Sequence, residues 1–145
     1  MAFQLFIAIS MVVLTLIFHV AGLAGLLVLI RQRGRRRVGR RVILADVGML
    51  LLVVNGVFVL HLFEQLAYAL LYLAGGATDT FRDAFVFSAG QYTTAGSDVS
   101  VRRNWRLLAA IEGADGVILL GFSTAFFVSI LARIRELQDE WRRGK

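Results

Sequence analysis

The chain contains no cysteine and no proline. Without cysteine it can form no disulfide, no thiolate metal site and no cysteine nucleophile. Without proline, any bend in a helix has to come from glycine or from a local hydrogen-bond defect. Charged residues make up only 18% of the 145 residues, whereas 58% are hydrophobic and the mean hydropathy is +0.72. This balance lies far from that of soluble proteins and indicates a membrane protein of one domain.

Three mainly apolar runs, residues 3–30, 42–74 and 107–132, reach the length of about 20 residues that a helix needs to span a bilayer. The first run lacks the basic start of a secretory signal and is about twice its usual length, so we expect a retained helix. The second run would be about 50 Å long as a helix, against about 30 Å of hydrocarbon. It is expected to tilt, to protrude, or to break before Ala74.

Between the first two runs lies a loop rich in arginine. Such a cluster beside spanning helices favours the cytoplasmic side and contacts anionic lipid headgroups. The C-terminal tail is again basic, so we expect the N-terminus outside and the C-terminus in the cytoplasm, although Arg102, Arg103 and Arg106 weaken the bias. Nucleic-acid binding is not expected; the acidic surface of a partner is the remaining alternative. The headgroup-binding residues are Arg31, Arg33, Arg35, Arg36, Arg37, Arg40 and Arg41.

The expected outer segment contains a short amphipathic helix. Thr80 can cap it, and Asp83 stands in its first turn, where acidic residues are favoured. About twelve residues cannot span a bilayer. The helix therefore either re-enters the membrane halfway or lies flat at the interface. Non-helical backbone at membrane depth is tolerated only where it is buried in protein or lines water, so re-entry would place the turn after Tyr92 on an ion path.

Residues 84–88, 92–99 and 105–113 resemble the pore region of small bacterial potassium-channel-like proteins, which usually read T-T-V/L-G-Y-G-D at the turn. The resemblance covers about residues 60–133 and implies a homotetramer in the bacterial inner membrane. In such filters, rings of backbone carbonyls replace the hydration shell of the ion, here K⁺ or Na⁺. No other cofactor is expected, and an accessory partner is not specified. The filter and ion-pathway residues are Thr93, Thr94, Ala95, Gly96, Ser97 and Asp98.

The turn departs from the family pattern, because Gly-Tyr-Gly is replaced by Gly96-Ser97 directly before Asp98. The missing second glycine would supply a backbone conformation that is cheap only for glycine. Strict potassium selectivity is therefore not expected. Two functions remain open: a weakly selective cation channel, and a non-conducting structural or accessory membrane subunit.

Ionisable residues within spanning helices cost at least a few kcal/mol and are functional candidates. His61 and Glu64 share one helix face, as do Glu112 and Asp115, because each pair is three residues apart. All four are expected near one depth, as a hydrogen-bonded belt behind the filter. Arg82 or Gln91 are candidate further partners. An alternative role is to tune ion passage, or to sense pH through His61.

His19 in the first run is expected to be a lone polar residue at a helix contact. A haem held by His19 and His61 is argued against by a depth difference of about 12 Å. No zinc or carboxylate-rich metal cluster is visible in the sequence. An enzyme is not expected either, since no Ser-His-Asp arrangement at matching depth and no phosphate loop are found.

The third run carries small residues at four-residue spacing, which allow close helix packing. The resemblance implies a hinge at Gly121 and a hydrophobic constriction at Phe122 and Phe126. The sequence thus predicts an all-α membrane protein with three transmembrane helices and a re-entrant pore helix. Its parts are an N-terminal helix and loop (1–41), a pore module (42–135, with helix 42–74, pore helix and filter 80–98, and inner helix 105–133) and a tail (136–145).

Overall fold

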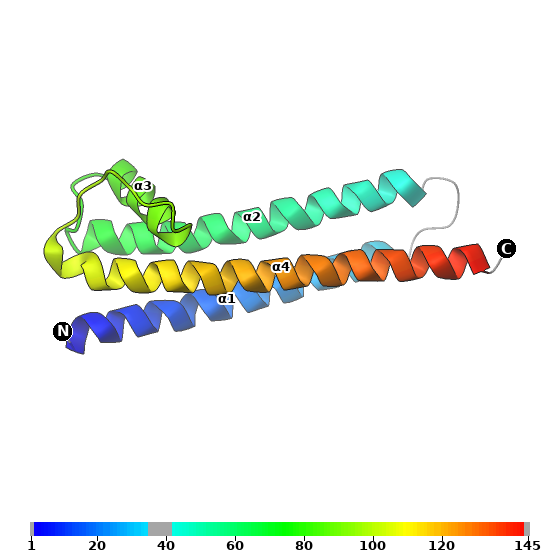
Figure 1. Ribbon diagram of the computed structural model, residues 1–145, viewed down its shortest axis with the longest axis horizontal. Helices are drawn as coiled ribbons and strands as arrows, with labels where there is room; N and C mark the ends of the chain where they lie inside the picture. The colour runs from blue at the N-terminus through cyan, green and yellow to red at the C-terminus, as the bar shows by residue number, and fades with distance from the viewer. Residues whose placement is uncertain (1, 35–41, 144–145) are drawn as a thin grey trace.

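The computed structural model describes residues 2–34 and 42–143, with side chains placed for 2–32 and 47–136. Three long helices run along one axis, and a short oblique helix lies against one end of them (Figure 1). The predicted all-α class is confirmed for the described residues. In chain order the elements are α1 (Ala2–Gly34), α2 (Val42–Ala74), α3 (Phe81–Tyr92), a 3₁₀ turn (Arg103–Trp105) and α4 (Arg106–Arg143).

The long helices carry three candidate membrane spans, Ala2–Gln32, Val47–Ala74 and Arg103–Glu136. Large apolar side chains cover their outer surfaces; Phe6 is 69% exposed and Phe58 is 60% exposed. Apolar surfaces of this extent need lipid or further protein to cover them. By length and composition, the chain is an integral membrane protein.

The ends of the long helices differ in part from the sequence expectation. Helix α2 is unbroken from Val42 to Ala74, so of the three expected alternatives a break before Ala74 is excluded, and tilting or protrusion remain. Helix α1 continues beyond its apolar run to Gly34, and α4 continues beyond the predicted end at residue 133 to Arg143. Both extensions are rich in charge and contain neither proline nor a turn sequence that would stop a helix.

Helix α3 begins and ends where local chemistry dictates. The Thr80 hydroxyl accepts a hydrogen bond from the backbone N–H of Asp83 at 3.1 Å, so the predicted cap is confirmed. After Tyr92 the backbone turns sharply, with positive φ at Thr94 (59°) and Gly96 (80°). The N–H of Gly96 then donates back to the carbonyl of Gly90 at 3.0 Å. The result is a short helix closed by a tight reversal.

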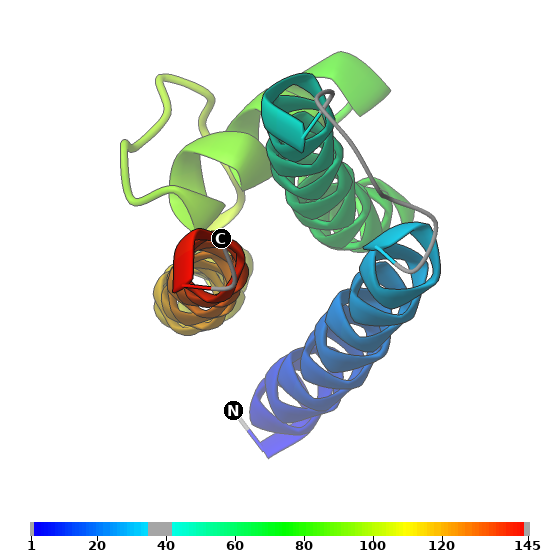
Figure 2. The same cartoon turned by 90° about the vertical axis from the view of Figure 1, so that its right-hand side faces the viewer.

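The reversal lies alongside the bundle and not across its end. The carbonyl of Tyr92 contacts Gly116 of α4 so closely that a Cβ at residue 116 would collide with it. Gly116 is ten residues beyond Arg106, which places it about 15 Å along α4. Helix α3 therefore descends from the end of the bundle toward its middle, packed against α2 and α4 on the side away from α1 (Figure 2).

Two apolar clusters occupy opposite ends of the bundle. The first surrounds α3 and includes Tyr68, Tyr72, Phe87 and Leu108. The second consists of Ile30, Val53, Ile130 and Ile134, with partly buried neighbours. Buried polar side chains lie between the helices next to the first cluster, and they form the candidate site.

Candidate functional site

A column of buried polar side chains lies between α1, α2 and α4, in three layers counted from the end that carries α3. In the first layer the carboxylate of Glu112 is held by the hydroxyls of Tyr72 at 2.6 Å and Ser88 at 2.5 Å. The Ser88 hydroxyl also faces the carbonyl of Gln65 at 2.9 Å. This layer fastens α3 to both α2 and α4.

The second layer is centred on Asp115. Its carboxylate accepts hydrogen bonds from Thr15 of α1 at 2.7 Å and from Tyr68 of α2 at 2.9 Å. Asp115 is 2% exposed, so water contributes little to its solvation. Three helices therefore meet at one carboxylate.

The third layer is the densest. The carboxylate of Glu64 lies 2.7 Å from Nδ1 of His19 and 3.0 Å from Nδ1 of His61, and it accepts a hydrogen bond from Tyr92 at 2.5 Å. The Tyr92 hydroxyl is also 2.7 Å from Nδ1 of His61. On the far side of the rings, both Nε2 atoms face the hydroxyl of Ser123, at 3.1 Å for His19 and 3.0 Å for His61. All four helices contribute to this layer.

Helical spacing explains why these side chains converge. On α2 the residues are three or four positions apart, at 61, 64, 68 and 72, so they share one face. Thr15 and His19 are four apart on α1 in the same way. On α4, residues 112, 115 and 123 lie on the face that packs against α2 and α1. The polar face of each of these three helices is buried against the other two helices.

The predicted belt residues His61, Glu64, Glu112 and Asp115 are all buried in this column, but they occupy different layers. Their described partners are hydroxyl groups and His19. Arg82 is exposed and Gln91 lines a separate hollow, so the expectation that either joins the belt is wrong. Tyr68 and Tyr72 follow Glu64 at four-residue intervals, so the sequence already indicated that tyrosine hydroxyls share a helix face with the belt.

The expectation that His19 is a lone polar residue is wrong, and so is the depth difference between His19 and His61. Their ring centres are 5.1 Å apart. Helix α1 continues past the end of the apolar run at Ile30 to Gly34, and these four residues account for about 6 Å of the expected difference. A haem is still disfavoured for another reason: both rings share Ser123 as a partner, which leaves no room for a porphyrin between them.

Ser123, His61 and Glu64 stand in the order of a serine-hydrolase triad with glutamate as the carboxylate, an arrangement that the sequence analysis did not predict. Catalysis of acyl transfer additionally needs donors for an oxyanion. Ser123 lies inside α4, where neighbouring backbone N–H groups donate to carbonyls one turn earlier. It is also 7% exposed, between helices. The three side chains thus have the order of a triad but lie enclosed between the described helices.

The predicted filter residues form the reversal after α3. Thr93, Thr94, Ala95 and Gly96 are exposed in the single chain, and Ser97 accepts a hydrogen bond from the backbone of Val99 at 3.1 Å. The Gly96 carbonyl lies against Gly90, where a side chain would collide with it. Asp98 is exposed on the returning segment.

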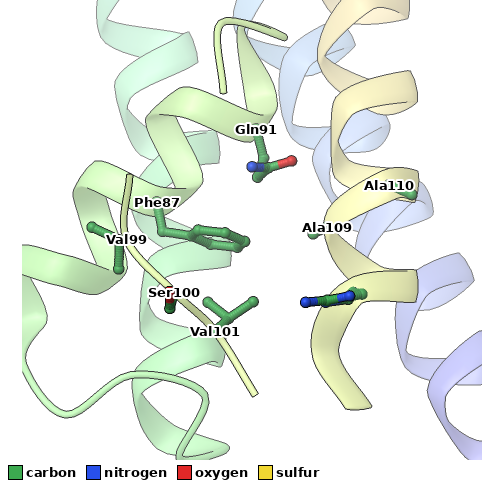
Figure 3. Close-up of a pocket in the computed structure, with 8 residues that line it drawn as sticks. Phe87, Gln91, Val99, Ser100, Val101, Ala109 and Ala110 are labelled. Carbon is green, nitrogen blue, oxygen red and sulfur yellow. The ribbon is translucent and has the colours of Figure 1, made fainter. Parts of the chain in front are cut away.

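A hollow of about 360 Å³ separates the returning segment from α4 (Figure 3). Phe87 and Gln91 of α3, Val101 of the returning segment, and Ala109 and Ala110 of α4 border it. Val99 and Val101 of the returning segment pack against the first apolar cluster beside this hollow. Ser88 and Tyr92 attach α3 to the polar column.

The structure gives the surroundings of the predicted hinge, constriction and headgroup-binding residues but does not test their roles. Gly121 is exposed, Phe122 is 47% exposed, and Phe126 packs partly against the second apolar cluster. Of the predicted headgroup residues, Arg31 is exposed. The side chain of Arg33 and residues Arg35, Arg36, Arg37, Arg40 and Arg41 lie outside the described part.

No family model, curated protein or solved structure matches this chain. The inference of function therefore depends on the geometry of the site.

Proposed function

We propose that the chain assembles as a homotetramer in which four copies of the hairpin 93–98 surround a weakly selective cation path. Each chain would contribute α2 as an outer helix and α4 as an inner helix. The N-terminus would face outside, and the arginine-rich loop and the tail would face the cytoplasm, where anionic headgroups contact them.

The observation that carries the proposal is exposed, non-helical backbone beside the middle of a membrane span. Gly116, which contacts Tyr92, lies close to the centre of the span Arg103–Glu136. The residues after Tyr92 are exposed in the single chain. Lipid cannot satisfy the polar groups of such a backbone, so water or other protein chains have to cover it. A central pore in a tetramer supplies both the water and the neighbouring chains.

Two further features support this arrangement. The polar column holds α3 from behind through Ser88 and Tyr92, which would fix the hairpin at a defined depth. A stripe of small or hydroxyl residues on α4, including Gly121 and Thr124, is exposed in the single chain. In a tetramer such a face is suited to line a water-filled cavity.

Ion preference follows from the hairpin. The carbonyl groups of Thr93, Thr94 and Ala95 are candidates to face the ion, while Asp98 would add negative charge at the mouth. The hairpin is one residue shorter than the potassium filter and lacks its second glycine. Fewer carbonyl rings would replace fewer waters of hydration, so Na⁺ and K⁺ would be poorly distinguished.

The absence of cysteine gives a sharp test. A Thr94→Cys variant, reconstituted in liposomes, should take up Rb⁺ or Na⁺, and a charged thiol reagent should abolish that uptake. The matched control is Val20→Cys on α1, which is 50% exposed on a face expected to contact lipid, and whose uptake should be insensitive to the reagent. Cross-linking followed by gel analysis should give tetramers. A monomer, or a dimer as the largest species, would contradict the pore.

The second candidate is a non-conducting accessory subunit with the same frame. The position of the Gly96 carbonyl favours it, because that group lies against Gly90 and is not free to face an axis. Intact tetramers that show no uptake in any cation gradient would support this candidate over the first.

A further inference from the structure

The third layer of the polar column differs from the other two, because it brings two imidazoles together with a carboxylate and a phenol. From this convergence we infer that His19, His61 and Glu64 bind a transition-metal ion of the Zn²⁺ class, with Tyr92 at the fourth position. The inference does not depend on conduction, since the site is complete within one chain.

The spacing of the ligand atoms suits one ion. The ligand atoms of His19, His61 and Glu64 all lie within 4.8 Å of one another. Ligands at about 2.0–2.1 Å from a tetrahedral zinc ion are about 3.3 Å apart. The contacts of Glu64 with the two Nδ1 atoms, 2.7 and 3.0 Å, are a few tenths of an ångström shorter. Small side-chain rotations would open this space, and two histidines with a glutamate are an established zinc ligand set.

The opposite side of the two rings provides independent support. Metal-bound histidines usually donate their second ring N–H to a fixed acceptor, which sets the tautomer and the ring orientation. Here both Nε2 atoms face the same hydroxyl, Ser123. A serine oxygen has two lone pairs and can accept from both rings at once. With that tautomer both Nδ1 lone pairs point toward Glu64 and Tyr92, and a cation placed between these groups would accept all of them as ligands.

Charge and burial point the same way. His19 and Glu64 are 0% and 1% exposed, so an unbalanced charge in this layer would be costly. The carboxylate of Glu64 would offset part of the charge of the ion, and the hydroxyl oxygen of Tyr92 lies within reach as a fourth, neutral donor. Because Tyr92 directly precedes Thr93, the bound ion would also fix the inner end of the hairpin.

The test uses the full chain without a polyhistidine tag, purified in detergent and stripped with a chelator. Titration with Co²⁺ should give the visible absorption of tetrahedral cobalt, saturating at one ion per chain, and Zn²⁺ should abolish it by competition. Ser123→Ala should keep the band but weaken binding by about 10- to 100-fold. His19→Ala and Glu64→Gln should remove the band.

The matched control is Glu112→Gln, a buried carboxylate in the first layer, which should bind Co²⁺ as the unmodified chain does. Absence of a tetrahedral band in the unmodified chain overturns the inference, whatever the variants do. An unchanged band in correctly assembled His19→Ala and Glu64→Gln proteins overturns it as well. Because the Co²⁺ titration of the unmodified chain alone can contradict the proposal, the test remains valid even if a variant does not fold.

Discussion

The two halves of the helix bundle are held together by different means. In the half that carries α3, carboxylates at Glu64, Glu112 and Asp115 are each paired with hydroxyl or imidazole groups from other helices. In the other half, the buried side chains of the second cluster make apolar contacts with one another; they are Ile30, Val53, Ile130 and Ile134. Within a bilayer, lipid tails offer similar apolar contacts, so such packing selects a partner weakly.

The comparison shows where the specificity of the fold is located. A carboxylate in hydrocarbon has few alternatives to its native donors, so the polar half fixes the register of all three long helices. Helix α3 joins this half through Ser88 and Tyr92. The position of the hairpin therefore depends on the polar column as well as on the apolar cluster around α3.

The largest effect is expected at the contact between α3 and α4. Gly116→Ala should destabilise the folded chain by about 3 kcal/mol, because the new Cβ collides with the backbone carbonyl of Tyr92, which cannot move without displacing the hairpin. Thermal unfolding in detergent measures the change. Gly121→Ala is the matched control, since no described atom lies within 4 Å of its Cβ position. Equal losses in both variants would mean that the hairpin does not depend on this contact.

A smaller effect is expected in the first polar layer. Glu112→Leu removes the partner of Tyr72 and Ser88 and should cost about 2 kcal/mol, since two buried hydroxyls lose an acceptor. Glu112→Gln should cost much less. Its amide can donate to Ser88, whose own proton then goes to the carbonyl of Gln65, and its oxygen still accepts from Tyr72. Denaturant titration of the two variants under the same conditions measures the difference in the free energy of unfolding. If Glu112→Gln is destabilised as much as Glu112→Leu, this account of the first layer is contradicted.

The cap of α3 should matter less than the column. Thr80→Ala should cost about 1 kcal/mol, because the N–H of Asp83 loses its acceptor. Thr124→Ala is the control, an exposed hydroxyl that bonds within its own helix to Leu120. Hydrogen exchange of α3 amides should rise in the first variant alone. No rise would indicate that tertiary contacts hold the first turn without the cap.

The smallest effect is expected in the apolar half. Ile130→Val deletes one methyl group from a contact of low specificity and should cost about 0.5 kcal/mol. Thermal unfolding under the conditions used for Glu112→Leu gives a direct comparison. A cost equal to or larger than that of Glu112→Leu would reverse the contrast between the two halves.

Local rules were enough to predict α2 and α3. The bounds of α2 follow from an apolar run without a stop, and those of α3 from the cap at Thr80 and the turn before Gly96. The partners of the polar residues could not be predicted in the same way. Which hydroxyl meets Glu112 depends on how far α2 and α4 rotate about their axes, and hydropathy does not report that rotation.

The error over His19 has a similar origin. Apolar composition shows where a helix can contact lipid, but α1 continues through Arg31 to Gly34, so a depth counted from its apolar end is about 6 Å too small. The roles assigned to Gly121, Phe122 and the hairpin need neighbouring chains, and they stay predictions.

The distribution of the polar column along the chain also bears on biosynthesis. His19 and Glu64 are 45 residues apart and can pair once α2 has left the translocon. Nε2 of His19 and the hydroxyls of Tyr72 and Tyr68 have to wait for Ser123, Glu112 and Asp115 of α4, which follow 104, 40 and 47 residues later. Until α4 is inserted, the first two helices would expose unsatisfied hydroxyl and imidazole groups to lipid. A nascent chain stalled before α4 would thus display the polar intramembrane surface that membrane chaperones and proteases can recognise.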